Sequence, residues 1–179
     1  MGRNRFHIVI VVLAMVAGAI VLTLSLHNRK QPPSGDVPKD GSMSAIDPSA
    51  KRLAEDAIAE SVFRYQFTQC FSERKLSLFF LTRNYMEDPS DAFIQRFAGT
   101  SNAVRKFSSA DVSGTIEDKD SRKLGILLGV GKINWLDDSR VEVEGSCSFD
   151  SENRLGYAYK VTRKRNRWVV KDSEIISMT

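Results

Sequence analysis

Histidine is nearly absent from this chain. The two histidines, His7 and His27, flank one apolar run, so residues 28–179 contain none. A Ser-His-Asp or Cys-His catalytic site, a histidine general base and histidine-bound zinc all require an imidazole. The sequence therefore excludes these kinds of site from the part of the chain that follows the run.

Cysteine is also scarce. Cys70 and Cys147 are the only two, which is too few for a four-cysteine metal site, and they are too far apart for a CxxC motif. In an oxidising compartment they would form one disulfide. Otherwise they would be two buried thiols, because cysteine is among the most buried residue types. Both alternatives stay open.

Acidic side chains are missing from residues 1–30, which hold four basic residues, Arg3, Arg5, Arg29 and Lys30. The whole chain has 26 Lys and Arg residues against 22 Asp and Glu residues, so these four account for its net charge of +4. The remainder is neutral and lacks the basic surface typical of nucleic-acid-binding domains. We expect no nucleic-acid partner.

Residues 1–30 contain instead a long apolar run, from Phe6 to Leu26. As a helix rising about 1.5 Å per residue, the run would span roughly 30 Å, the thickness of a bilayer core. It is longer than the apolar core of a cleaved signal peptide, about 7–15 residues. We expect residues 1–27 to be a cytoplasmic tail and a single transmembrane anchor, with a cleaved signal peptide as the alternative.

Basic residues flank the run on both sides, so the positive-inside comparison is nearly tied. The short tail favours an N-terminus in the cytoplasm and a domain outside the inner membrane. Residues 28–48 hold four prolines and almost no apolar side chains, which predicts a flexible linker. We therefore expect residues 49–179 to be a tethered extracytoplasmic domain.

Helical signals open the domain. Asp47 followed by Pro48 is typical of a helix start, with the acid as N-cap and proline in the first turn. Apolar residues then recur at helical spacing, which predicts a helix to about Gln69.

A short second helix is expected within residues 88–97. Asp88 is the predicted cap, with Pro89 in the first turn. Phe93 and Phe97 are four residues apart and would share one face.

The second half of the chain has the two-residue period of strands. Val141 and Val143 alternate with Glu142 and Glu144, as in a half-buried strand. Short polar turns between the segments indicate antiparallel neighbours. The expected strands are residues 76–85, 112–117, 124–135, 140–149, 155–163 and 167–178. The sequence thus predicts an α+β domain in which one long and one short helix pack on a curved antiparallel sheet of about five to six strands.

The order of four motifs resembles a family of uncharacterised bacterial proteins, many of which carry a signal or anchor. The motifs are VFRYQF (62–67), DPSDAFIQRF (88–97), EDKDSRKLGILLGVGKINWLDDSRVEVEG (117–145) and GYAYKVTRKRNRWVVK (156–171). The resemblance covers residues 50–179 and implies no catalytic residue. More loosely, a long helix wrapped by a curved sheet resembles the nuclear-transport-factor-2-like or cystatin-like fold.

The densest basic cluster is Arg163, Lys164, Arg165 and Arg167, at the expected turn between the last two strands. Such a run is usually a solvated hairpin tip. It is also suited to contact with anionic lipid headgroups or an acidic partner. These four are our candidate interaction residues.

The segment GILLGVGKI, residues 125–133, has the glycines and lysine of a phosphate-binding loop. Five residues instead of four separate Gly125 from Gly131, Ile133 stands where Ser or Thr is needed, and no helix is expected to follow. We predict a central strand whose glycines allow close approach of a neighbour.

Five acids lie near predicted turns: Glu117, Asp118, Asp120, Asp137 and Asp138. Carboxylates of this kind bind calcium or act as an acid/base pair. Their spacing is not that of an EF-hand, and we interpret them as solvated turn residues. We expect no metal and no cofactor.

Two functions stay open. The leading one is a membrane-anchored interaction domain that contacts other envelope proteins or anionic lipids. The alternative is a small-molecule or carboxylate-based enzymatic pocket inside a cone-shaped fold, with Arg64 and Arg96 as polar candidates. A concavity filled by Phe63, Phe67 and Trp135 would argue against the alternative.

Overall fold

A computed structural model describes residues 47–70 and 76–179. Residues 42–179 form one compact unit. The expected anchor and all but the end of the expected linker lie outside the described residues. Within the described ranges, no helix has both the length and the apolar character needed to span a membrane.

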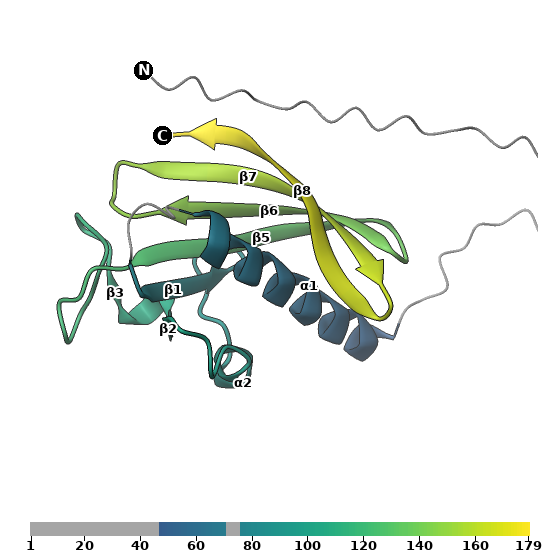
Figure 1. Ribbon diagram of the computed structural model, residues 1–179, viewed down its shortest axis with the longest axis horizontal. Coiled ribbons are helices and arrows are strands. Elements are labelled where there is room, and N and C mark those ends of the chain that lie inside the picture. The colour runs from purple at the N-terminus through teal and green to yellow at the C-terminus, as the bar shows by residue number, and fades with distance from the viewer. Residues whose placement is uncertain (1–46, 71–75) are drawn as a thin grey trace, which may run out of the picture. The chain divides into compact units, whose positions relative to one another are not determined.

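The domain is α+β, with helix α1 (Pro48–Gln69) lying across one face of a six-stranded sheet (Figure 1). The strands in spatial order are β2 (Ala103–Lys106), β1 (Leu78–Arg83), β5 (Ile126–Asp137), β6 (Arg140–Ser148), β7 (Arg154–Lys164) and β8 (Arg167–Met178). The remaining elements are α2 (Asp91–Gln95), the 3-10 helix η1 (Phe107–Ser109) and a short ladder of β3 (Ala110–Asp111) and β4 (Glu117–Asp118).

The prediction of a wholly antiparallel sheet is wrong, because the sheet is mixed. Strands β5 to β8 form the expected antiparallel meander, but β1 pairs in parallel with both β2 and β5. Parallel neighbours require a crossover connection. Here α2 lies in the connection from β1 to β2, and the longer path to β5 also contains η1, β3 and β4.

Helix α1 begins where its sequence signals predict, since Asp47 Oδ1 accepts a hydrogen bond from the Ser49 amide at 3.1 Å. The cap of α2 is predicted incorrectly. Ser90 accepts from the Phe93 amide at 3.2 Å, whereas Asp88 accepts from the Ser108 amide at 2.8 Å. Asp88 thus ties the loop before α2 to η1.

Two edge elements also differ from expectation. Residues 112–117 do not form the predicted strand: β3 ends just before them, at Asp111, and only Glu117 belongs to a strand, β4. Strand β2 was not expected, since its four residues contain a single large apolar side chain, Val104, which is half-buried. Short edge strands of this kind carry little sequence signal.

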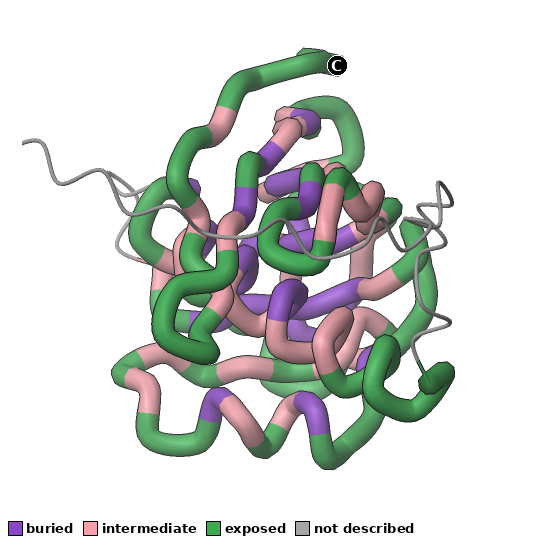
Figure 2. Tube along the Cα trace, turned by 90° about the vertical axis from the view of Figure 1, so that its right-hand side faces the viewer, coloured by how far each residue is buried: buried purple, intermediate pink, exposed green. Residues whose placement is uncertain are grey.

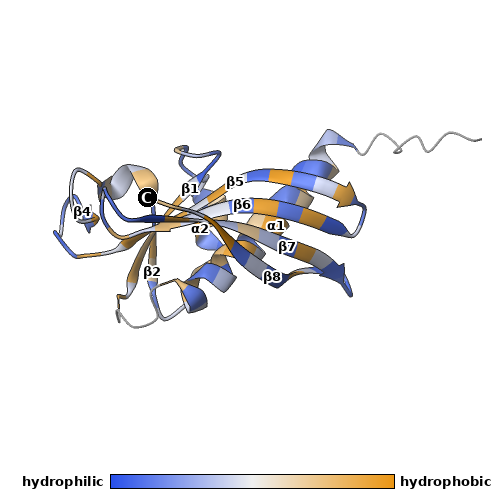
Figure 3. Cartoon of the chain, turned by 90° about the horizontal axis from the view of Figure 1, so that it is seen from above, coloured by the Kyte–Doolittle hydropathy of each residue, from blue (hydrophilic) through white to orange (hydrophobic). Residues whose placement is uncertain are grey.

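The main core lies between α1 and the sheet. Ile58, Ala59, Val62 and Phe63 are fully buried on the inner side of α1. Figure 2 shows buried segments in the interior of the domain, and Figure 3 shows apolar bands on strands of the sheet. Helix α2 is shorter than the predicted segment, so Phe93 lies in α2 and Phe97 in the turn that follows it, with their ring centroids 5.6 Å apart. The ring of Phe63 meets both edge-on, at 6.0 and 6.2 Å, which anchors α2 to α1.

A second, smaller cluster lies on the other face of the sheet. It consists of Leu78, Phe80, Ala110 and Ile116. The segment containing β3 and β4 therefore covers the end of the sheet that α1 does not. Ser146 and Ser148 of β6 are also buried, although the alternation of apolar and polar residues in this strand predicts both on a solvent face.

One polar side chain, Gln66, is fully buried beneath α1. Its Nε2 donates to the carbonyl oxygen of Gly129 at 3.2 Å, to that of Ser146 at 3.4 Å, and to the Tyr159 hydroxyl at 3.2 Å. Its Oε1 has no hydrogen-bond partner among the described atoms. Burial raises the pKa of Tyr159, so this hydroxyl stays neutral. Gln66 thus fixes α1 over β5 and β6.

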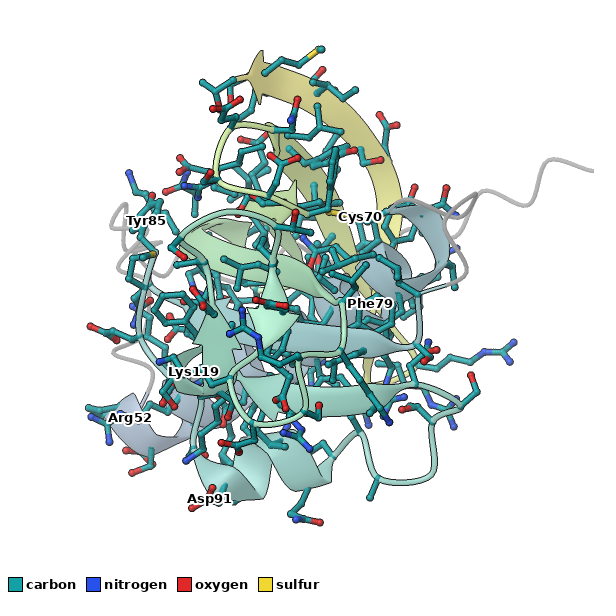
Figure 4. All side chains as sticks on the ribbon, turned by 90° about the vertical axis from the view of Figure 1, so that its left-hand side faces the viewer. Arg52, Cys70, Phe79, Tyr85, Asp91 and Lys119 are labelled. Atoms are coloured by element: carbon teal, nitrogen blue, oxygen red, sulfur yellow. A yellow bond between two sulfur atoms is a disulfide. The ribbon has the colours of Figure 1, made fainter. Side chains whose placement is uncertain are left out.

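The structure joins Cys70 to Cys147 in a disulfide, with their Cα atoms 6.3 Å apart. Cys70 is the C-cap of α1 (Figure 4), and Cys147 lies near the end of β6. The bond closes a loop with a sequence separation of 77 residues. It holds the C-terminal end of α1 against the centre of the sheet.

Replacing both Cys70 and Cys147 by serine should lower the free energy of unfolding by about 2–4 kcal/mol, the usual contribution of a disulfide. The measurement is urea unfolding of residues 42–179 purified from an oxidising compartment. Alkylation of that native protein with iodoacetamide should modify neither cysteine. Two modified thiols would contradict the bond.

Replacing Gln66 by methionine keeps the side-chain length but removes the donor shared by three acceptors. We expect a loss of about 1–3 kcal/mol in the free energy of unfolding, towards the lower end because the orphan Oε1 is removed as well. The exposed Gln69→Met provides the control and should stay within about 0.5 kcal/mol of wild type. Equal stability of both variants would refute this role of Gln66.

Candidate functional site

The four candidate basic residues lie together at the hairpin that joins β7 to β8. Arg165 and Asn166 form its two-residue turn and both have positive φ, 46° and 63°, the backbone that such turns require. All four basic side chains are exposed. Arg163 Nη2 donates to Asn166 Oδ1 at 3.3 Å. We call Arg163–Arg167 the basic hairpin.

The basic hairpin is not neutralised by nearby acids. Among the residues that the structure describes, none of the ion pairs involves its four basic side chains. Lys171 adds a further cation, and the neighbouring Lys164 lowers the pKa of Lys171 by a hydrogen bond and by repulsion. This end of β8 is therefore electropositive.

A groove of about 590 Å³ lies between α1 and the beginning of β8. Its lining combines five residues of α1 with five of the hairpin and β8: Ala57, Glu60, Ser61, Arg64, Tyr65, Asn166, Arg167, Trp168, Val169 and Val170. We call it the α1–β8 groove. Its volume is in the range typical of ligand sites, about 300–1,000 Å³.

The floor of the α1–β8 groove is apolar and supported from below. Trp168 and Val170 are half-buried against the main core. Trp168 meets Trp135 edge-on, with ring centroids 5.6 Å apart, and Trp135 Nε1 donates to Glu55 of α1 at 3.5 Å. At the other end, the hydroxyls of Tyr65 and Ser173 are hydrogen-bonded at 3.2 Å. The groove is thus bounded at both ends.

Arg64 and Arg96, the polar candidates for an internal pocket, belong to a surface network instead. Arg64 pairs with Glu60 at 2.9 Å and donates to the Arg96 carbonyl at 2.7 Å. Arg96 reaches Glu60 at 3.4 Å and Asp56 at 3.6 Å, and Arg83 reaches Asp56 at 2.8 Å. Three cations share two acids, so the network keeps one positive charge in excess.

The concavity between α1 and the sheet is filled by side chains. Phe63 is fully buried, Phe67 stacks on Phe79 at 4.7 Å, and Trp135 packs against the core. These three aromatic side chains therefore occupy the space that the alternative function requires. The geometry therefore gives no support to an internal pocket.

A second hollow, of about 270 Å³, lies on the face of the sheet turned away from α1. Tyr85, which follows β1 with φ 75° (Figure 4), donates to Glu144 at 2.7 Å. This hydrogen bond raises the pKa of Tyr85. Arg154 donates to the Ser146 hydroxyl at 3.2 Å. The polar groups at this hollow thus bind one another in pairs.

The prediction that the turn acids are solvated is wrong for Asp118, and Asp118 and Asp137 both have structural partners. Asp118 is fully buried and accepts from the Ser121 hydroxyl at 2.7 Å and the Ser121 amide at 2.8 Å, and it pairs with Arg105. Hydrogen bonds from Ser139 and Arg140 lower the pKa of Asp137 to about 2. No cluster of three or more potential metal ligands occurs in the described ranges.

Gly129 and Gly131 lie in strand β5, as predicted, and Gly125 directly precedes it. The segment is therefore not a phosphate loop. A Cβ at Gly125 would lie 2.6 Å from the Phe80 ring, and one at Gly131 would lie 3.0 Å from the Tyr85 ring. Both glycines therefore make room for aromatic side chains. Lys132 lies within strand β5 and is exposed, so it is not part of a phosphate-binding loop.

Sequence reasoning found the basic hairpin but missed the α1 side of the groove. Ala57 and Ser61 are the small residues there, and they stand one helical turn apart. Small residues at that spacing on a helix leave room beside it, which is the signal that would have indicated the groove.

No protein-family model, no curated protein and no solved structure matches the chain. The resemblance drawn from the four motifs therefore stays a prediction.

Changing Asp118 to asparagine should destabilise the domain most at neutral pH. The partners of Asp118 lower its pKa below the ordinary value of 3.8, so its carboxylate stabilises the fold above that value and loses this effect as the pH falls through the folded-state pKa. The wild-type advantage in melting temperature over Asp118→Asn should therefore shrink between pH 7 and pH 3. The exposed Asp120→Asn provides the control. An equal effect of both changes would refute the assignment.

Proposed function

We propose that this chain is a single-pass membrane protein of the inner membrane, whose extracytoplasmic α+β domain, residues 49–179, binds other envelope proteins. The apolar run Phe6–Leu26 supports the anchor. The Cys70–Cys147 disulfide supports a domain outside the cytoplasm, because disulfides persist in oxidising compartments.

The observation that carries the interaction role is the α1–β8 groove beside the basic hairpin. An open groove with an apolar floor next to unpaired cations is a surface suited to recognition. The filled concavity offers no comparable space for an enzymatic site. Anionic lipid headgroups are the other chemistry that four exposed cations would bind.

The test is photocrosslinking in cells of the source organism. A photoreactive phenylalanine analogue replaces Val169, which lines the groove and is 38% exposed. At a second position it replaces Glu152, which is exposed in the turn between β6 and β7 and does not line the groove. We expect envelope proteins to be captured from position 169 and not from position 152. Identical adducts from both positions, or none, would overturn an interaction surface at the groove.

Reversing the charge at Arg165 and Arg167 to glutamate should abolish capture from position 169. A control with the same change in net charge is Lys123→Glu with Lys132→Glu, since both of these lysines are exposed and lie outside the groove. Capture should persist in the control. Cosedimentation of residues 42–179 with phosphatidylglycerol vesicles tests the lipid alternative. If the Arg165/Arg167 reversal removes vesicle binding and no protein adducts form in cells, the ligand of the hairpin is anionic lipid and not an envelope protein.

A further inference from the structure

Strand β8 is one of the two edges of the sheet and presents a long row of backbone groups on one side. It has 12 residues, whereas the opposite edge strand, β2, has four. An edge strand is a template on which another extended segment can pair. The part of β8 that is free to do so can be identified from the hydrogen-bond pattern.

The pattern follows from the hairpin turn. Lys164 and Arg167 flank the two-residue turn and form the first pair of the ladder. The next pair is Arg163 and Trp168, and Arg163 donates its N–H to Ser139 on the opposite side, at 2.7 Å. Because hydrogen-bonded and non-hydrogen-bonded pairs alternate, Trp168 directs its N–H and C=O away from β7. By the same alternation, so does Val170.

The α1–β8 groove runs along this outward-facing stretch. Asn166–Val170 form one side of the groove and α1 forms the other. The free stretch is short, because β8 has a register shift opposite Lys160 and Val161 and the Tyr65–Ser173 contact follows it. The geometry fits a peptide of about four to five residues between a strand edge and a helix, which is a known mode of peptide recognition.

The charges around the α1–β8 groove favour an acidic ligand. Among the residues that line the groove, Glu60 is the only acid, and it already pairs with Arg64 and Arg96. Arg167 lines the groove without an ion pair, and the rest of the basic hairpin lies beside it. A second copy of this chain is disfavoured, since pairing two β8 edges would place the basic hairpin of one copy near Lys171 of the other.

We propose that the α1–β8 groove binds an extended, acidic segment of a partner protein, which adds as a strand to the edge of β8 at Arg167–Val170. This inference rests on the proposed interaction function and specifies its ligand. Backbone hydrogen bonds from Trp168 and Val170 would provide affinity, and the apolar floor and the cations would select alternating apolar and acidic side chains.

The test uses the full-length protein in phosphatidylcholine nanodiscs and a fluorescein-labelled pentapeptide amide, Glu-Val-Glu-Val-Glu, followed by fluorescence anisotropy. Saturable binding is expected, with at least about tenfold weaker binding of Lys-Val-Lys-Val-Lys. Arg167→Glu should weaken binding of the acidic peptide to a similar extent, whereas Lys132→Glu should not. Absence of binding, or equal binding of both peptides, would overturn the proposal.

Two N-methylated peptides test the backbone pairing. One carries methyl groups on the amides of both valines, the other on the amides of the third and fifth residues. Only alternate amides of an added strand face β8, so one peptide should lose at least about tenfold in affinity and the other should bind nearly normally. Equal affinities, reduced or not, would overturn strand addition.

Location is tested by filling the groove. Ser61→Trp places a large ring in it and should abolish peptide binding, while Arg52→Trp, outside the groove lining, should not. Melting temperatures report whether each variant folds. If Ser61→Trp does not fold, Arg167→Glu still tests the location of the site. Retained binding in a folded Ser61→Trp would refute the site. Envelope-protein capture at Val169 without peptide binding would refute this inference and leave the proposed function standing.

Discussion

The closeness with which α1 approaches β6 sets the architecture of this domain. A Cβ at Gly145 would lie 2.7 Å from the Tyr159 ring, 2.9 Å from the Gly129 carbonyl oxygen and 3.0 Å from Gln66 Nε2. Any larger residue there would force the helix and the sheet apart. Because Gly145 leaves this space, Gln66 reaches the carbonyl groups of β5 and β6, and the Cys70–Cys147 disulfide follows one helical turn later. The register of β5 against β6 shifts just beyond Gly145, between Val130 and Ile133.

The close packing of α1 on the central strands also affects the edge of the sheet formed by β8. Ile58, Val62 and Phe63 are fully buried, so the apolar side of α1 packs against the central strands. Strand β8 bends around the helix (Figure 1) and touches it through Tyr65 and Ser173. The small residues Ala57 and Ser61 leave space at the beginning of β8. The groove is therefore the gap that remains where the curved edge and the straight helix diverge.

Local signals predicted the parts of this fold that local interactions determine. The Asp47 cap and the helical spacing placed α1, and the polar turns and alternation placed β5 to β8. The parallel pairing of β1 with β2 and β5 could not be predicted, because it joins segments linked by long crossovers and leaves no periodic trace. The cap of α2 could not be predicted from the local sequence, since Asp88 and Ser90 both suit an N-cap and only the tertiary contact of Asp88 with Ser108 distinguishes them. Likewise, the basic hairpin is visible in the sequence, but the groove depends on Ser61 and Val169, residues 108 positions apart.

The groove and the basic hairpin lie towards the end of α1 at which the chain enters the domain. Trp135 contacts Glu55, two turns from Pro48, and the groove begins at Ala57. A linker of about 20 residues has a mean reach of roughly 25 Å, so the proposed tether would keep this end of the domain near the bilayer. The chain without its first 30 residues is neutral overall, yet the four basic side chains of the basic hairpin lie at this end. An acidic segment close to the membrane surface would therefore encounter the groove at a high effective concentration, and a modest intrinsic affinity for four residues of β8 would be sufficient for recognition.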